Sequence, residues 1–342
     1  MISRPVHIME VCGTHTMAIA RSGIKKILPP QIKLISGPGC PVCVTDQSAI
    51  DQAIKLARQP NVIMTTFGDM MRVPGSTGSL SDARTAGADI RTLYSPMDAV
   101  EIAQQHKEKN IVFMGVGFET TSPTIAATVM HARTKRLNNF FVLTHFKLLF
   151  PALAALANSA DMHIDGFICP GHVSVITGTK PYEIFARKYK KPCVITGFED
   201  SDIINGITRL MRLIRTHAPR VEIEYTRAVR PNGNTRARNI LYSVFKPVDS
   251  FWRGFGSIPK SGLAFKKAYK QFDAESRFSL SLPASKPPKG CLCGDILRGV
   301  RVPSECRHFG KRCTPEHPIG PCMVSSEGTC AAEFRYGTYH YE

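Results

Sequence analysis

Short apolar runs alternate with amphipathic stretches along the first two-thirds of the chain. The apolar runs predict β-strands at residues 6–11, 32–36, 62–67, 111–118, 140–146, 166–169 and 194–197. Stretches with apolar residues three or four positions apart predict helices at 14–21, 45–58, 97–107, 123–134, 151–159, 182–189 and 202–217. Apolar strands separated by amphipathic helices are typical of parallel sheets covered by helices on both faces.

This alternation predicts an α/β protein with more strands than one small sheet holds. We expect two doubly wound parallel-sheet domains, at residues 5–95 and 96–218. After about residue 220 the periodicity fades, and glycine, proline and basic residues become frequent. We expect a third domain of α+β type at 219–342, stabilised partly by what its cysteines bind.

Composition is that of a folded chain, since 43% of the 342 residues are hydrophobic. No apolar run reaches the roughly 18 to 20 residues that a membrane-spanning helix needs. The first residues also lack the basic and then apolar order of a signal peptide. We therefore expect a cytoplasmic protein without a membrane segment.

The charge is strongly positive, with 44 Lys and Arg against 27 Asp and Glu and a net charge of +17. Residues 205–270 contain 14 Lys and Arg but three acidic residues, and so carry +11. Such a stretch fits nucleic acid, an acidic protein or an anionic surface, or is an ordinary solvated face. No compact basic block occurs, and the single tryptophan, Trp252, makes no stacking platform. We therefore expect an acidic protein partner rather than nucleic acid.

Six of the eleven cysteines lie near the C-terminus, at Cys291, Cys293, Cys306, Cys313, Cys322 and Cys330. Structural zinc sites favour cysteine pairs with two or four other residues between them (C-x2-C or C-x4-C), and this segment has no such pair. Irregularly spaced cysteines suit a [4Fe–4S] cluster, which takes four thiolates and leaves two that could form a disulfide. Zinc or disulfides alone remain alternatives.

Two further groups of cysteines follow predicted strands. Cys40 and Cys43 form a C-x-x-C pair in a Gly- and Pro-rich loop, where a following helix capped by Thr45 would lower a thiol pKa. Cys12 lies where a strand turns into a helix, three residues before His15. A thiolate beside an imidazole suits soft-metal binding or nucleophilic chemistry, although either group could be structural.

Polar residues in other loops after strands are candidates for a shared cleft, because ligands bind beyond the carboxyl ends of parallel strands. Glu119, His172 and Asp69 lie in such loops, and Glu119 could alternatively cap a helix. Cys169 and Cys193 fall within apolar strand patterns, and we expect them to be inert core thiols.

Six motifs, in this order, resemble those of the hydrogenase maturation factor HypD family, and the resemblance covers about residues 8–336. They are Met9-Glu10-Val11-Cys12-Gly13-Thr14-His15-Thr16, Gly37-Pro38-Gly39-Cys40-Pro41-Val42-Cys43, Thr66-Phe67-Gly68-Asp69-Met70-Met71-Arg72-Val73-Pro74-Gly75-Ser76, Gly117-Phe118-Glu119-Thr120-Thr121, Pro170-Gly171-His172-Val173-Ser174 and Gly320-Pro321-Cys322-Met323-Val324-Ser325-Ser326-Glu327-Gly328. Members of that family usually begin with a helical segment before the first strand. The present sequence departs from this pattern, because its first predicted strand starts within a few residues of Met1.

The resemblance implies a scaffold on which the Fe(CN)2CO unit of [NiFe]-hydrogenases is assembled, rather than a conventional turnover enzyme. It implies that Cys12 binds the iron and that Cys40 and Cys43 are a redox-active pair. By analogy with ferredoxin:thioredoxin reductase, Cys293 and Cys322 would form a disulfide beside the [4Fe–4S] cluster. The implied cluster ligands are Cys291, Cys306, Cys313 and Cys330.

The resemblance also implies partners. The chain would be a monomer alone and a heterodimer with a HypC-type chaperone, and it would receive cyanide from HypE acting with HypF. A cluster-dependent disulfide reductase is the alternative function. Cys12 separates the two hypotheses, because an iron scaffold needs this thiol and a reductase does not.

Overall fold

The structure is a computed structural model that describes residues 4–161, 163–280 and 287–337. The chain forms two compact units, and each unit is assembled from segments that are distant in sequence. Unit 1 contains the described residues up to Val44, Leu149–Thr235, and the described residues from Gly290 onward. Unit 2 contains Thr45–Leu148 and the described residues of Arg236–Lys289.

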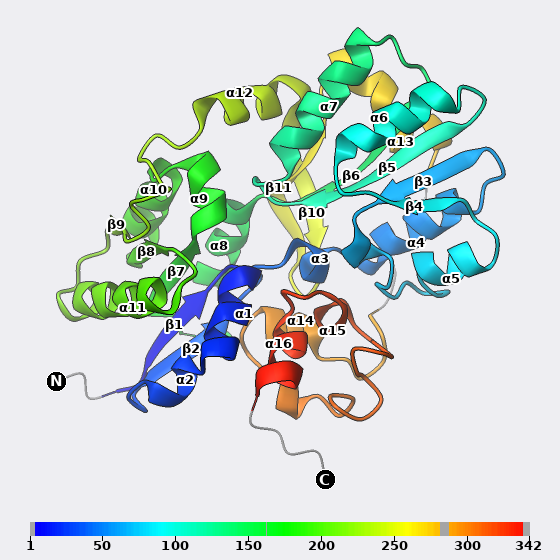
Figure 1. The fold of residues 1–342 in the computed structure, drawn as a ribbon. Helices are drawn as coiled ribbons and strands as arrows, with labels where there is room; N and C mark the ends of the chain where they lie inside the picture. Colours follow the sequence, from blue (N-terminus) through cyan, green and yellow to red (C-terminus); the bar gives the residue numbers. More distant parts are fainter. Residues whose placement is uncertain (1–3, 162, 281–286, 338–342) are drawn as a thin grey trace. The chain divides into compact units, whose positions relative to one another are not determined.

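A five-stranded parallel sheet, in the order β2-β1-β7-β8-β9, forms the centre of unit 1 (Figure 1). Its strands are β1 (Val6–Glu10), β2 (Ile32–Ser36), β7 (Gly166–Pro170), β8 (Cys193–Thr196) and β9 (Val221–Ile223). Ile8 of β1 aligns with Leu34 on one side and with Gly166 on the other. From β1 the chain moves to β2 at one edge, and it later returns at β7 on the opposite side. The strand order therefore reverses between β1 and β7, where α/β folds bind their ligands.

The helices of unit 1 are α1 (Gly13–Ser22), α2 (Ile24–Ile27), α3 (Pro41–Val44), α8 (Leu149–Ala157), α9 (Gly171–Thr177), α10 (Lys180–Tyr189), α11 (Asp200–Arg215), α14 (Cys293–Leu297), α15 (Pro321–Val324) and α16 (Thr329–Tyr336). Helix α11 packs against β7, β8 and α1 over a core that includes Ile8, Ile19 and Leu210. The C-terminal helix α16 packs against α1 (Figure 1), and α14 and α15 contact α3. The cysteine-rich segment thus belongs to the same unit as Cys12.

Unit 2 contains a four-stranded parallel sheet in the order β4-β3-β5-β6 and an antiparallel hairpin. The strands are β3 (Val62–Thr66), β4 (Ile90–Thr92), β5 (Asn110–Gly117), β6 (Phe140–Phe146), β10 (Phe245–Trp252) and β11 (Gly256–Phe265). The helices are α4 (Gln47–Ala57), α5 (Leu80–Thr85), α6 (Pro96–Gln105), α7 (Ser122–Thr134), α12 (Thr235–Val244, with Thr235 assigned to unit 1) and α13 (Ala274–Phe278). In this sheet the strand order reverses between β3 and β5.

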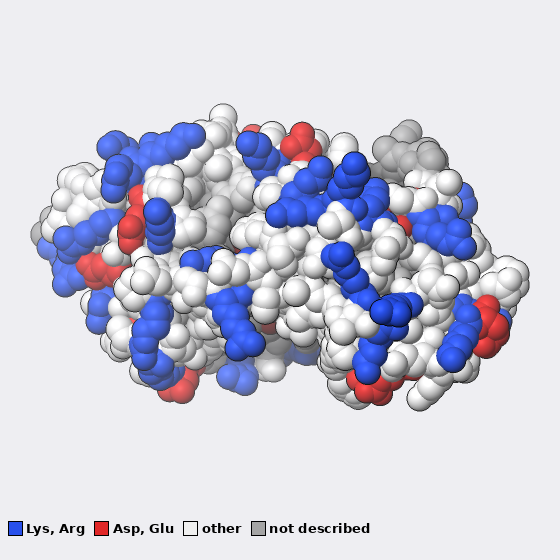
Figure 2. Space-filling view, turned by 90° about the horizontal axis from the view of Figure 1, so that it is seen from above, with Lys and Arg blue, Asp and Glu red and all other residues white. Residues whose placement is uncertain are grey.

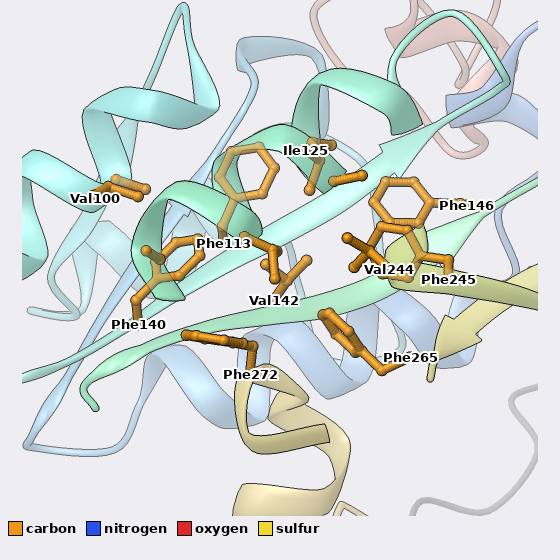
Figure 3. Close-up of a cluster of buried hydrophobic side chains, with 14 of the residues drawn as sticks. Val100, Phe113, Ile125, Phe140, Val142, Phe146, Val244, Phe245, Phe265 and Phe272 are labelled. Atoms are coloured by element: carbon orange, nitrogen blue, oxygen red, sulfur yellow. The ribbon is translucent and has the colours of Figure 1, made fainter. Parts of the chain in front are cut away.

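Aromatic side chains from both parts of unit 2 share one core (Figure 3). Phe113 and Phe146 lie on the parallel strands, whereas Phe245 and Phe265 come from the hairpin. The Phe146 and Phe245 rings pack edge to face with centroids 5.4 Å apart. This shared core explains why residues 236–280 fold with a sheet that ends about 90 residues earlier in the sequence.

The α/β class and the two parallel sheets are confirmed, and the predicted strands and helices lie within two or three residues of the observed ones. The division of the chain differs from the contiguous ranges 5–95, 96–218 and 219–342. Strands β1 and β2 pair with β7 rather than with β3, and the segment after residue 219 is divided between the units. Periodicity along the chain cannot reveal such pairing, because it reports which face of a strand is buried and not which neighbour covers it.

Two local predictions also need correction. Cys43 is not in an open loop, because residues 41–44 form the helical turn α3, which Cys40 directly precedes. Helix α4 is capped by Asp46 rather than Thr45: the Asp46 carboxylate accepts a hydrogen bond from Ser48 N at 3.0 Å. No helix in the described part of the chain is long and apolar enough to cross a membrane.

Candidate functional site

Cys12 lies at the carboxyl end of β1, next to the point where the strand order of unit 1 reverses. It is the N-cap residue of α1, with extended backbone angles. The Gly37–Cys43 segment is held against it, since Gly13 N donates to Gly39 O at 3.0 Å. A Cβ atom on Gly39 would lie 2.2 Å from the Cys12 nitrogen, so only glycine fits there. The backbone thus joins two of the predicted motifs into one site.

The Cys12 thiol is 7% exposed. Burial raises the pKa of Cys12 to about 12, and the backbone N–H groups of His15 and Thr14 oppose that rise. The carboxylates of Glu327 and Glu10 raise the pKa further. The helix terminus therefore favours the thiolate, as the sequence suggests, but desolvation is the larger effect. A cation at the sulfur would reverse this balance.

Glu10 is a site residue that the sequence analysis did not single out. Its side chain is buried, with Oε2 accepting the Cys12 N–H at 3.0 Å and Oε1 accepting the Thr16 hydroxyl at 2.5 Å. Burial raises its pKa to about 7, against the opposing effect of the Thr16 and Cys12 hydrogen bonds. The sequence offered one signal for Glu10: it is an acidic residue at the end of an apolar, buried strand. Burying a charged group costs free energy, so such a residue usually has a specific role.

His15 is buried beside the same strand ends. Its Nε2 lies 2.8 Å from Gly197 O, which can only accept, so Nε2 carries the proton. The other ring nitrogen, Nδ1, is buried and has no hydrogen-bond partner in the described part of the chain. Burial lowers the pKa of His15 to about 4, so the ring is neutral and Nδ1 has a free lone pair. The backbone N–H of His15, and not its imidazole ring, makes the contact with the Cys12 thiol.

His172 follows β7 and belongs to the same group of side chains. The Phe198 ring lies between two histidines, 4.2 Å from the centroid of His172 and 4.8 Å from that of His15. His172 is exposed, whereas His15 is fully buried. The predicted residues after β1 and β7 are therefore brought together within unit 1.

Cys40 directly precedes the helical turn α3, and Cys43 lies within it. Cys43 N donates to Cys40 Sγ at 3.3 Å, and Cys40 Sγ donates to the Ser325 hydroxyl at 3.2 Å. Cys43 is completely buried, and burial raises its pKa well above the ordinary value. The expected lowering of a thiol pKa in this pair is therefore wrong for Cys43, because the short turn supplies less stabilisation than desolvation removes.

Six C-terminal cysteines line one small pocket together with apolar side chains such as Phe309 and Met323. They are Cys291, Cys293, Cys306, Cys313, Cys322 and Cys330. Burial and the neighbouring thiols raise the pKa of Cys291 to about 12, and raise that of Cys330 as well. No group of three His, Cys, Asp or Glu residues in the described ranges is placed to hold a single metal ion. An apolar pocket lined by more than four thiols suits a group larger than a single metal ion, such as a [4Fe–4S] cluster.

Sulfur atoms form a continuous chain from this pocket to α3. Cys293 Sγ and Cys322 Sγ are 2.8 Å apart. The contact with Cys293 lowers the pKa of Cys322. The contact with Cys43 and the burial of Cys322 raise this pKa, and the net result is a rise. Cys43 in turn contacts Cys40. The helical turns α3 and α15 thus bring together two thiol pairs that are about 280 residues apart in sequence.

Asp69 and Glu119 lie in unit 2, on the loops that follow β3 and β5. These loops flank the reversal of strand order in that sheet. Glu119 is buried. Asp69 is exposed as a residue, and partial desolvation of its carboxyl group raises its pKa. Their role in a shared cleft stays a prediction. Cys169 and Cys193 lie on adjacent strands of unit 1 and are fully buried, as core thiols are.

The basic stretch 205–270 is divided between the two units. Figure 2 shows Lys and Arg side chains spread over one face of the molecule, with Asp and Glu in small groups. In unit 1, Glu222 alone accepts ion pairs from Arg209, Arg212 and Arg220. Positive charge therefore remains in excess there.

Comparison with known proteins identifies the family. The family model described as "HypD: Hydrogenase formation hypA family" matches residues 1–337. The chain belongs to the HypD family. It is 46% identical over 344 residues to hydrogenase maturation factor HypD2 of Bradyrhizobium diazoefficiens, covering 98% of this chain and 90% of that protein. It is 45% identical over 329 residues to a putative hydrogenase expression/formation protein of Methanocaldococcus jannaschii, covering 96% and 91%.

HypD membership confirms the family inferred from the six motifs, and with it a role in hydrogenase maturation. Four of these motifs contribute residues to the site in unit 1, namely those with Cys12, Cys40, His172 and Cys322. The remaining two motifs carry Asp69 and Glu119 in unit 2.

Proposed function

We propose that this HypD-family chain is a scaffold for assembling the Fe(CN)2CO unit of [NiFe]-hydrogenase, with Cys12 as a ligand of the iron. The observation that carries the proposal is the position of Cys12. It is a thiol at the strand-order reversal of unit 1, bordered by Glu10 and by the segment that carries Cys40 and Cys43. Thiolates are soft ligands that suit iron carrying cyanide and carbonyl groups.

The iron is the substrate of this site. Its charge would stabilise the Cys12 thiolate against the burial that otherwise keeps the thiol protonated. Glu10 holds the backbone of Cys12 through the 3.0 Å hydrogen bond, so that the sulfur keeps its place at the start of α1. A HypC-type chaperone would supply a second iron ligand, and HypE with HypF would supply cyanide.

The thiol pairs can exchange oxidation states without any atom outside the chain. If Cys40 and Cys43 form a disulfide, the Cys322 thiolate attacks Cys43 Sγ and Cys40 leaves as a thiolate. Cys293 then attacks Cys322 Sγ, forming the Cys293–Cys322 disulfide and releasing Cys43. Each thiol that attacks gives up one proton, and each released thiolate takes one. The contacts of Cys322 with both Cys43 and Cys293 support this order.

The six-cysteine pocket supplies enough thiols for a [4Fe–4S] cluster, which Cys291, Cys306, Cys313 and Cys330 would hold. When bound, the cluster would supply one-electron transfer. This assignment leaves Cys293 and Cys322, the two thiols already in contact, for the exchange. The apolar walls of the pocket exclude water from the cluster.

A disulfide reductase would use the same sulfur chain, and Cys12 decides between the two functions. We expect Cys12→Ala to abolish hydrogenase maturation in cells while leaving the far-ultraviolet circular dichroism and the acid-labile sulfide content of the cluster unchanged. Infrared spectra of the anaerobically purified complex with a HypC-type chaperone should show cyanide and carbonyl bands for the unmodified chain and none for the variant.

The matched control is Cys193→Ala, which removes a fully buried thiol far from the sulfur chain and should keep both maturation and the bands. Active hydrogenase in cells that contain only Cys12→Ala would reject the scaffold and favour the reductase.

A further inference from the structure

Unit 1 has an open groove at the opposite end of its sheet from Cys12. The groove has a volume of about 690 Å³ and lies between α11 and the segment that joins α2 to β2. Ile32 begins β2, whereas Cys12 follows the carboxyl end of β1, so the groove does not overlap the iron site. The inference below is therefore independent of the proposed function.

The lining of the groove is apolar. Leu28 and Ile32 form one wall, and Ile204, Ile207 and Met211 of α11 form the other. Ile204 is 40% exposed, and the neighbouring Ile27 is 69% exposed. Leu28, Ile32 and Met211 are partly buried in the walls of the groove, so that they and the exposed Ile204 form a continuous apolar surface, and such surfaces mark interaction sites on folded proteins.

The wall on α11 has the length of a short helix. Its residues Ile204, Thr208, Met211 and Arg215 recur every three or four positions and therefore lie along one side of α11. Eleven residues of helix span about 16 Å, or three turns. A groove of this length beside a helix suits an amphipathic helix whose apolar residues are three or four positions apart.

The charge around the groove selects the partner. Its lining residues include Arg212 and Arg215 and no carboxylate. Arg212 shares Glu222 with two other arginines, and Arg215 makes no ion pair in the described part of the chain. An arginine without an ion pair, beside a second arginine that shares its carboxylate with two others, makes the border of this apolar groove complementary to carboxylates on the ligand.

We propose that this groove, lined by Leu28, Ile32, Ile204, Met211, Arg212 and Arg215, docks an amphipathic helix of an acidic partner protein. The aliphatic face of that helix would cover Ile204 and Met211, and its Asp or Glu residues would pair with Arg212 and Arg215. Docking here would leave Cys12 and His172 accessible to the maturation chemistry. A partner could thus be held on unit 1 without occupying the iron site.

The test uses the full-length chain and a fluorescein-labelled 18-residue helical peptide with leucines three and four positions apart, bordered by glutamates. Fluorescence anisotropy should show saturable binding that weakens between 50 and 300 mM salt, by about tenfold for a few charge contacts. A peptide with lysines in place of the glutamates, and a scrambled acidic peptide, should bind at least about tenfold more weakly.

Matched variants locate the binding. Ile204→Glu and Arg215→Glu should each weaken binding of the acidic peptide by about tenfold or more. Ile184→Glu and Arg187→Glu, on the exposed side of α10, make the same chemical changes outside the groove and should have no effect.

Three results would overturn the proposal. The first is equal binding of the acidic, basic and scrambled peptides, or no binding of any. The second is equal loss in the α10 variants. The third is concentration-dependent dimerisation that Ile204→Glu abolishes, which would assign the groove to a second copy of this chain.

Discussion

Gly39 shows how a single residue holds the site together. A side chain at this position would meet the backbone of Cys12, with its Cβ 2.2 Å from N and 2.4 Å from Cα. Neither side can move easily, because Gly13 N and Gly39 O are hydrogen-bonded and Gly37 N donates to Glu10 O. The restriction is one of space: the contacting atoms belong to the backbone and not to the tip of a flexible side chain.

We expect Gly39→Ala to lower the free energy of unfolding by roughly 2 kcal/mol or more, as steric overpacking does. Chemical denaturation, followed by circular dichroism, measures this loss. Gly68→Ala is the control, since its Cβ would meet only Thr92 Cγ2 at an ordinary 3.6 Å. Equal stability of the two variants would mean that the Gly39 segment does not rest on Cys12.

Glu10 and His15 are residues whose burial favours their neutral forms. Burial raises the pKa of Glu10 to about 7 and lowers that of His15 to about 4. Near neutral pH the site therefore holds a neutral imidazole beside a carboxyl group close to its titration point. Only packing produces this state, because both shifts come from desolvation first.

At the scale of elements, the β10–β11 hairpin is fastened to β6 by Lys147. Its buried ammonium group donates to Ser250 Oγ and to Phe251 O, both at 2.6 Å, and Leu148 N donates to Ser261 O. Burial lowers the pKa of Lys147 to about 8, with Asp46 opposing the change. The hairpin is therefore held by an ammonium group whose charged form is disfavoured by burial in the folded state.

Lys147 makes stability depend on pH. Between pH 8 and 10.5 the unfolded chain holds the Lys147 proton and the folded chain has lost it, so Lys147 makes unfolding less favourable as pH rises. We expect the difference in unfolding free energy between the unmodified chain and Lys147→Met to shift in favour of the unmodified chain from pH 7.5 to 10. Taking the difference removes the buried thiols, which act in the opposite direction in both proteins. A constant difference would show that Lys147 is not desolvated.

Helical turns α3 and α15 decide which thiols meet. They bring Cys43 and Cys322 into contact, so we expect the two thiol pairs to share oxidation equivalents. Alkylation and mass spectrometry at controlled potentials should show Cys40–Cys43 and Cys293–Cys322 changing together in the unmodified chain.

Cys322→Ser removes the thiol that links the two pairs. The oxidation state of Cys40–Cys43 should then no longer respond to the state of Cys293. Cys169→Ser removes a thiol that belongs to neither of the two thiol pairs, and it should leave the coupling intact. Independent titration of the two pairs in the unmodified chain would reject the exchange.

At the scale of the whole molecule, the cysteine-rich segment completes unit 1 rather than forming a body of its own. Helix α16 packs on α1, and Glu327 accepts the Thr14 hydroxyl at 2.6 Å. The pocket with six thiols and the Cys12 site thus belong to one compact unit. Loss of a group that binds in the pocket is therefore expected to affect the packing around α1.

We expect the anaerobically purified chain to carry about four irons and four sulfides, since a [4Fe–4S] cluster has that content. Cys306→Ala with Cys313→Ala should lose most of both in chemical analysis and lower the thermal midpoint. The control pair, Cys169→Ala with Cys193→Ala, also removes two buried thiols and should keep the cluster. Full iron content in the first variant would reject the ligand assignment.

The sequence by itself determined the secondary-structure elements and the family. Apolar runs and helical spacing depend on local side-chain order, so strands such as β2 and β6 could be read at their observed limits. The motifs identified the family and marked Cys12, Cys40 and Cys43, because glycines and cysteines in these loops reflect backbone and ligand requirements that are written locally.

The tertiary structure decided what the elements do together. Pairing of β1 with β7, and folding of residues 236–280 onto β6, join segments at least 90 residues apart, which no local pattern encodes. Burial then set the ionisation of Glu10, His15 and Cys43, since desolvation depends on every neighbour at once. The sulfur chain from Cys40 to Cys293 arises for the same reason: proximity in space is a property of packing, whereas cysteine spacing is a property of the sequence.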